Sequence, residues 1–174
     1  SPPPLDACFA AVSYAYPWTG LVIDYKLNGN PGLSAVLATL LRSTTWVEPA
    51  LERCDLLIHL PMYLPSLRER GFNQALELAR HLSPRKTDAR LLLRIRDTPS
   101  QRPLKRIERQ RNVAGAFALE PLRAQRVRGQ RVVLVDDVMT SGASLFAAAR
   151  TLREAGAAHI TALALARTDD PLAA

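Results

Sequence analysis

The sequence predicts an α/β fold built on a mostly parallel sheet flanked by helices. Mainly apolar segments without polar alternation occur at 55–60, 132–135 and 160–166, a pattern typical of strands buried on both faces. Segments with apolar residues at helical spacing occur at 75–82 and 145–155. Strands that alternate with helices imply βαβ crossovers, in which neighbouring strands run parallel.

The first half of the chain predicts a strand, two helices and a second strand. Cys8–Tyr16 has the residues of a short strand, and Leu21–Leu27 has a helical pattern that stops at the turn residues 28–32. A second helix is expected from Leu33, because apolar residues recur there at helical spacing. Asp55–Leu60 is the next predicted strand, and we interpret its histidine, His59, as an interior residue rather than a base.

The second half predicts further strands around a cationic loop. Residues 96–112 combine two prolines and many cations with few apolar residues, so we expect a mobile, exposed loop there. The elements predicted on either side of this loop are a helix at Ala75–Leu82, a strand at Leu91–Ile95, an extended segment at Val113–Leu119, a helix at Leu145–Ala155 and a strand at Ile160–Ala166.

The length and composition fit a single domain. A chain of 174 residues can bury a sizeable core, and we expect one domain over 1–174, with a strand and helices of 1–50 packed on a core of 55–168. No apolar run could cross a bilayer, and the N-terminus does not resemble a signal peptide. Cys8 and Cys54 are expected to be buried free thiols. We therefore expect a cytoplasmic protein without membrane insertion, whose oligomeric state the sequence does not indicate.

The segment that carries the most chemistry follows the strand at 132–135. Asp136 and Asp137 end that strand, and small residues follow before a helix: Thr140, Ser141, Gly142, Ala143 and Ser144. Small residues at a helix N-terminus let backbone N–H groups approach an anion closely. The two carboxylates would repel a phosphate, so we expect them to face sugar hydroxyls or Mg²⁺. The sequence thus indicates a phosphosugar site, and the alternative is an acidic strand end before an ordinary helix cap.

The net charge of +7 is concentrated in one part of the chain. Between Arg85 and Arg131 there are 14 Lys or Arg residues against 4 Asp or Glu residues. Such a cationic segment indicates a polyanionic partner, either a pyrophosphate-bearing ligand or nucleic acid. The alternative is an arginine-rich loop that reflects only the overall composition.

The stretch from 132 to 144 resembles the phosphoribosyl-pyrophosphate (PRPP) motif of type I phosphoribosyltransferases. That motif is an apolar strand, two acids, two further residues and a Thr/Ser-Thr/Ser-Gly-x-Thr/Ser loop, and the stretch matches it throughout. The resemblance implies a type I phosphoribosyltransferase fold that binds PRPP. It places the ribose hydroxyls on Asp136 and Asp137 and the 5-phosphate on residues 140–144. Mg²⁺ would be held near the two carboxylates through PRPP, not by the protein alone.

Two other segments are similar to the ComF/GntX family, bacterial proteins with a phosphoribosyltransferase-like domain. Residues 68–75 look like its Arg-x-Arg-Gly-Phe-Asn-Gln signature, which implies a pyrophosphate loop formed by Arg68, Arg70, Gly71 and Asn73. Residues 98–117 follow its Thr-x-x-Gln-x-x-Leu-x-x-x-x-Arg-x-x-Asn-x-x-Gly-Ala-Phe pattern. The resemblance implies that a flexible loop neutralises the departing pyrophosphate with Arg102, Lys105, Arg106, Arg109 and Arg111. We count Arg109, with Asp136 and Asp137, as catalytic.

The family resemblance predicts a phosphoribosyltransferase with an unidentified acceptor, linked to competence and DNA uptake. Purine-specific relatives carry an acid where this chain has Met139 and Thr140, and no acceptor base is evident. The four-cysteine zinc module of ComF-like chains is absent, so we expect no zinc here. Either the sequence is a fragment that begins after that module, which its first residues, 1–4, favour, or the module was lost. The alternatives are a PRPP sensor without turnover and a single-stranded-DNA-binding module. Phe117 is the sole aromatic residue of 85–131, which counts against a stacking groove.

Overall fold

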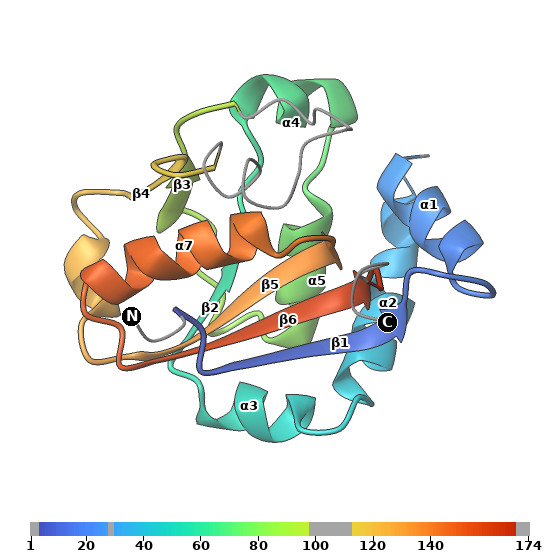
Figure 1. Ribbon diagram of the computed structural model, residues 1–174, viewed down its shortest axis with the longest axis horizontal. Coiled ribbons are helices and arrows are strands. Elements are labelled where there is room, and N and C mark those ends of the chain that lie inside the picture. The colour runs from blue at the N-terminus through green and yellow to red at the C-terminus, as the bar shows by residue number, and fades with distance from the viewer. Residues whose placement is uncertain (1–3, 28–29, 98–112, 170–174) are drawn as a thin grey trace.

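A four-stranded parallel sheet forms the centre of the computed structural model, which describes residues 4–27, 30–97 and 113–169 (Figure 1). Its strands are β1 (Ala7–Ser13), β2 (Leu56–His59), β5 (Arg131–Met139) and β6 (His159–Arg167). They follow the order β1-β6-β5-β2, and each neighbouring pair is parallel. The predicted α/β class with a parallel sheet is therefore confirmed.

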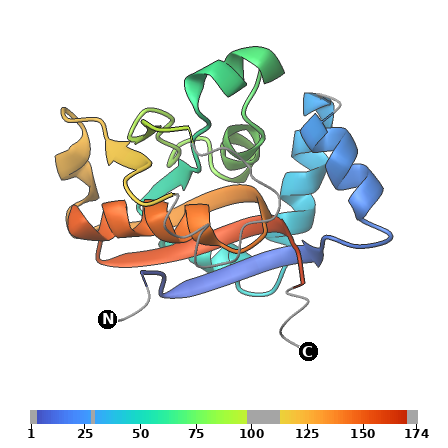
Figure 2. The same ribbon diagram turned by 45° about the horizontal axis from the view of Figure 1, so that its top comes forward.

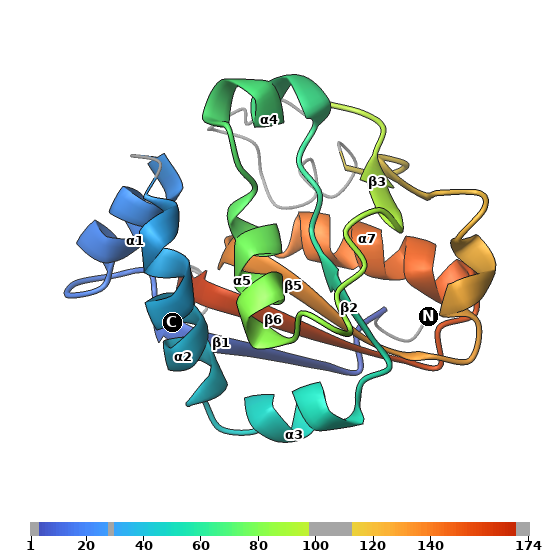
Figure 3. The same ribbon diagram turned by 180° about the vertical axis from the view of Figure 1, so that it is seen from behind.

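Helices cover both faces of this sheet. Those in the described ranges are α1 (Thr19–Leu27), α2 (Ser34–Arg42), α3 (Val47–Arg53), α4 (Leu64–Arg70), α5 (Gln74–Leu82) and α7 (Ala143–Glu154), with 3₁₀ turns at Pro31–Leu33 and Ala124–Val127. Helix α7 lies on the face turned to the viewer in Figures 1 and 2, and α2 and α5 lie on the opposite face, seen in Figure 3. No helix within these ranges is long and apolar enough to cross a membrane.

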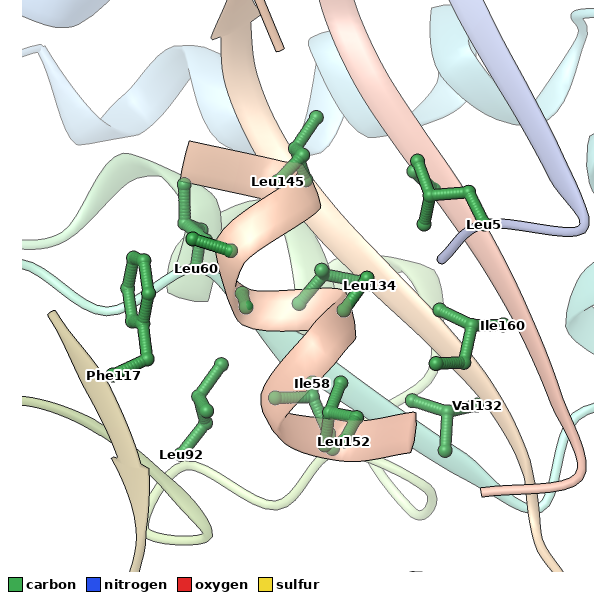
Figure 4. Close-up of a cluster of buried hydrophobic side chains, with 14 of the residues drawn as sticks. Leu5, Ile58, Leu60, Leu92, Phe117, Val132, Leu134, Leu145, Leu152 and Ile160 are labelled. Carbon is green, nitrogen blue, oxygen red and sulfur yellow. The ribbon is translucent and has the colours of Figure 1, made fainter. Parts of the chain in front are cut away.

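The unbroken apolar run in β5 is explained by burial on both faces. Val132 and Leu134 pack with Leu145 and Leu152 of α7 in one core cluster, shown in Figure 4. Val133 and Val135 belong to a second cluster with residues of α2 and α5. Because successive strand residues point to opposite faces, both sets must be apolar, and no alternation is visible in the sequence.

Some predicted elements take a different place in the fold. The strand predicted at Leu91–Ile95 is present as β3 (Leu92–Arg94), but it pairs antiparallel with β4 (Phe117–Leu119) in a separate two-stranded sheet. The first strand ends at Ser13, not Tyr16. Helices α3 and α4 were not predicted.

The expectation for the two cysteines is confirmed for one and wrong for the other. Cys54 is buried, whereas Cys8 is exposed. Cys8 belongs to β1, which is paired on one side only because it is the last strand in the sheet order. An edge strand of this kind leaves part of its surface open to solvent.

Candidate functional site

A cleft of about 790 Å³ lies at the carboxyl edge of the parallel sheet. It is bordered by the end of β5, the start of α7 and the segments around α4 and α5. The predicted site residues that line it are Arg70, Asn73, Asp136, Asp137, Thr140, Ser141, Gly142, Ala143 and Ser144. Carboxyl edges of parallel sheets are the usual position of ligand sites in open α/β folds. The structure thus brings the two acids and the small-residue loop into one cavity.

The two carboxylates occupy the last part of β5. Oδ1 of Asp136 accepts a hydrogen bond from the Asp137 backbone N–H at 2.8 Å, and Oδ1 of Asp137 accepts one from the Val138 N–H at 2.7 Å. Burial, and next the adjacent Asp137 charge, raise the pKa of Asp136 well above its usual range. Ionisation of both carboxylates is thus electrostatically unfavourable, and a bound cation or several hydroxyl donors would stabilise the charged forms.

Lys26 is a cation that lies close to this pair. Its Nζ lies 4.0 Å from Oδ2 of Asp137. The end of α1 that carries Lys26 is fixed to α5, because the Gln74 side chain donates to the Lys26 carbonyl at 2.8 Å. The buried Tyr25 hydroxyl donates to the Gln74 carbonyl at 2.8 Å. Lys26 is therefore held at the cleft by a hydrogen-bonded joint between two helices.

The loop at the start of α7 has the features of an anion site. Gly142 is the N-cap residue and has a φ of 74°, a left-handed conformation that favours glycine. A Cβ added there would lie 2.8 Å from Cε of Met139 and from Cε2 of Phe146, so the position is also too tight for a side chain. No acidic residue occupies the first turn of α7, and the one side-chain contact to its N–H groups that the structure gives is a long hydrogen bond of 3.4 Å from the Ala143 N–H to the Ser141 hydroxyl. The partial positive charge of the helix N-terminus consequently faces the cleft.

The predicted pyrophosphate loop is only partly assembled at the cleft. Arg70 ends α4 and lines the cavity, whereas Arg68 and Gly71 do not. Gly71 has a φ of 82° and lets the chain turn out of α4. Asn73 lines the cavity, but both polar atoms of its side chain form hydrogen bonds within the protein. Its Oδ1 accepts from the Leu76 N–H at 3.0 Å, and its Nδ2 donates to the Leu60 carbonyl at 3.3 Å. Arg70 is therefore the member of this set best placed to contact a ligand.

Other residues of the lining were not singled out as site residues from the sequence. Arg94, at the end of β3, lines the cleft with its guanidinium 5.6 Å from the ring centre of Phe117. Burial lowers the pKa of Arg94, while Asp97 and Asp136 oppose that shift. Tyr14 and Thr168 line the cavity as well. The sequence placed Arg94 inside an ordinary strand and gave no signal that β3 ends at the site.

The predicted flexible-loop residues Arg102, Lys105, Arg106, Arg109 and Arg111 lie outside the described residues. The structure consequently gives no position for Arg109, the third predicted catalytic residue. Within the ranges that the structure describes, no three His, Cys, Asp or Glu side chains cluster closely enough to hold a metal ion. The hard carboxylate oxygens of Asp136 and Asp137 suit Mg²⁺, but two side chains make only a partial ligand set.

His59 is not part of the cleft. It is buried in β2, which confirms its interior position, and burial lowers its pKa to about 4. Its Nδ1 has no hydrogen-bond partner among the described residues. The histidine is consequently neutral at physiological pH, and since it does not line the cleft it is not a base of this site.

Comparison with known proteins identifies the family. The chain matches the phosphoribosyl transferase domain family over residues 66–172. It is 31% identical to the DNA utilization protein YhgH of Escherichia coli K12 over 177 residues, covering 96% of this chain and 74% of that protein. It is 30% identical to Competence protein F of Haemophilus influenzae over 161 residues, covering 88% of this chain and 69% of that protein. The chain therefore belongs to the ComF family of proteins with a phosphoribosyl transferase domain.

Proposed function

We propose that this protein binds PRPP in the carboxyl-edge cleft and transfers its phosphoribosyl group to an acceptor in a process linked to DNA uptake. One observation carries the proposal: a single cavity joins the Asp136–Asp137 pair to the loop 140–144 at the N-terminus of α7. A paired carboxylate suits a diol, and a helix N-terminus suits a phosphate. The names of the relatives, which refer to DNA utilization and competence, support the biological context.

The 5-phosphate would occupy the loop 140–144. Backbone N–H groups at the start of α7 and the hydroxyls of Thr140, Ser141 and Ser144 are the available donors. Gly142 lets the loop keep its left-handed conformation, because any larger residue would contact Met139 and Phe146. The ribose hydroxyls would then reach Asp136 and Asp137, since both lie in the same cavity.

The pyrophosphate would lie toward the arginines that line the cleft. Arg70 and Arg94 both line the cleft and can donate charge-assisted hydrogen bonds to phosphate oxygens. Mg²⁺, when bound with PRPP beside Asp136 and Asp137, would help to neutralise the negative charge of the leaving group. As the bond at the anomeric carbon breaks, negative charge grows on the pyrophosphate, so the two guanidinium groups stabilise the transition state more than the ground state.

Calorimetry with PRPP and Mg²⁺ tests the binding part of the proposal. The Asp136→Asn/Asp137→Asn variant should lose Mg²⁺-dependent binding, because it removes both carboxylates from the cleft. Glu52→Gln/Glu154→Gln is the matched control, since it removes two exposed carboxylates from α3 and the end of α7. The control should bind like the wild type, and equal binding by the cleft variant would overturn the site assignment.

A pyrophosphate-release assay tests the transfer part. PRPP and Mg²⁺ are incubated with the protein and a panel of nucleobase and amine acceptors, and pyrophosphate is measured over time. Acceptor-dependent release that is lost in Asp137→Asn supports a transferase. Tight PRPP binding without release for any acceptor would instead support a PRPP sensor without turnover.

A further inference from the structure

A second cavity, of about 300 Å³, lies at the opposite edge of the sheet. It borders the amino end of β2 and the segments that follow α5 and β4. Five cationic side chains line it: Arg85, Lys86, Arg90, Arg123 and Arg126. All of them belong to the part of the sequence in which basic residues are concentrated, and the cleft at the carboxyl edge uses none of them.

A buried carboxylate fixes two of these cations side by side. Asp88 accepts hydrogen bonds from Nη1 of Arg123, at 3.2 Å, and from Nη1 of Arg126. The Asp88 side chain is only 5% exposed, whereas those of Arg123 and Arg126 are 36% and 50% exposed. Since a guanidinium carries five N–H donors, each arginine keeps outward donors after pairing with Asp88. The carboxylate thus orients two guanidinium groups toward solvent.

The remaining cations are not neutralised by carboxylates within the described part of the chain. Arg85 and Arg90 form no ion pair there, and Nζ of Lys86 donates to the backbone carbonyls of Leu51 and Glu52. Asp55 and Asp88 are the two carboxylates of the lining, against five cations. The cavity therefore carries a local excess of positive charge and attracts anions.

This cavity is too far from the PRPP cleft to assist there. Strand β5 begins with Arg131 at this edge and reaches Asp137 six residues later, a distance of about 20 Å. Side chains of Arg85 or Arg126 cannot span that distance to a ligand held by residues 140–144. The proposed PRPP chemistry consequently leaves the cationic cavity unexplained.

We propose that the cationic cavity binds the phosphodiester backbone of nucleic acid. Four of its five cations are arginine, whose planar guanidinium matches a phosphate with two parallel hydrogen bonds. No aromatic residue is found in its described lining, so bases have no stacking platform and binding is independent of base sequence. This inference is independent of PRPP binding, because it uses a different cavity and different residues.

The test is fluorescence anisotropy with a labelled oligothymidine strand and a labelled duplex, repeated over a series of NaCl concentrations. Arg85→Gln/Arg90→Gln removes two cavity charges and leaves the buried Asp88 paired with Arg123 and Arg126. Arg80→Gln/Arg150→Gln is the control, since both arginines are exposed on helices and neither lines the cavity; Arg80 is paired with Glu77. In the cavity variant, the plot of log affinity against log salt should be less steep by about 1.4 for the single strand, because two phosphate contacts are lost. Binding near 50 mM NaCl should be about tenfold weaker or more. The control should match the wild type.

Several outcomes would overturn this assignment. One is that neither nucleic acid binds detectably at low salt. Another is that the salt dependence of the cavity variant equals that of the wild type, and a third is that the control variant loses as much affinity as the cavity variant. Competition by polyglutamate as effective as that by oligothymidine would assign the cavity to an acidic protein segment instead. Displacement of the strand by PRPP with Mg²⁺ would place the strand in the carboxyl-edge cleft. The charge-conserving Arg85→Lys/Arg90→Lys variant should retain the wild-type slope, which separates lost charge from lost folding.

Discussion

Substitution of Gly142 by alanine perturbs the phosphate loop without changing any charge. Gly142 has a φ of 74°, and a residue with a Cβ loses about 1–2 kcal/mol in that left-handed conformation. The new Cβ would also lie 2.8 Å from Met139 and Phe146 side-chain atoms, which must move aside. We therefore expect Gly142→Ala to lower the free energy of unfolding by about 2 kcal/mol and the Tm by about 4–8 °C. PRPP affinity should fall about tenfold, because the displaced loop no longer fits the phosphate.

Urea denaturation and PRPP calorimetry measure these two effects in the same samples. Gly20→Ala is the matched control, because Gly20 lies in α1 with nothing within 4 Å of an added Cβ. Alanine there should raise the free energy of unfolding by about 0.5–1 kcal/mol and leave PRPP binding unchanged. Wild-type stability and affinity in Gly142→Ala would refute the role given to the loop conformation.

Three further substitutions test the carboxylate pair, the α1–α5 joint and the core. Because Asp136 has a raised pKa in the folded state, its contribution to stability is lost as pH rises through that pKa. Asp136→Asn should therefore melt above the wild type at pH 8, with a gain that shrinks as the pH is lowered and is absent below about pH 4; a pH-independent gain would contradict this. Tyr25→Phe removes the buried hydroxyl that contacts both the Gln74 carbonyl and the buried Ser34 hydroxyl, so urea denaturation should show a loss of about 1–3 kcal/mol in the free energy of unfolding. An unchanged midpoint would contradict a stabilising contact between α1 and α5. Leu152→Ala, at a fully buried position of α7, should cost about 2–5 kcal/mol in the same assay, and a loss under 1 kcal/mol would argue against that packing.

The central sheet and half of the site could be predicted because their signals are local in sequence. The apolar run 132–135, the two acids and the small residues 140–144 are contiguous, so one strand and one helix bring them together. Helix α4 gave no such signal, since none of its residues is buried and a helix without an apolar face shows no periodicity.

The rest of the site depends on contacts between segments that are distant in sequence. Arg94 reaches the cleft because β3 pairs with β4, and nothing near Arg94 specifies that partner. Lys26 faces Asp137 because Tyr25 and Gln74 join α1 to α5. The cationic cavity likewise requires Asp88 to meet Arg123 and Arg126, which lie more than thirty residues further along the chain. Composition showed that cations are concentrated in this segment, but not that they surround a buried carboxylate.

A titration of ¹⁵N-labelled protein with PRPP and Mg²⁺, followed through its backbone amide resonances, tests the proposed binding site most directly. If PRPP binds at the carboxyl edge, the amides of Gly142, Ala143 and Ser144 should shift saturably, because their N–H groups lie at the proposed phosphate site. The amides of Arg90 and Arg126, in the cationic cavity, should stay unchanged. Saturable shifts confined to the cationic cavity, or no shifts in the loop 140–144 at saturating PRPP, would contradict the proposal.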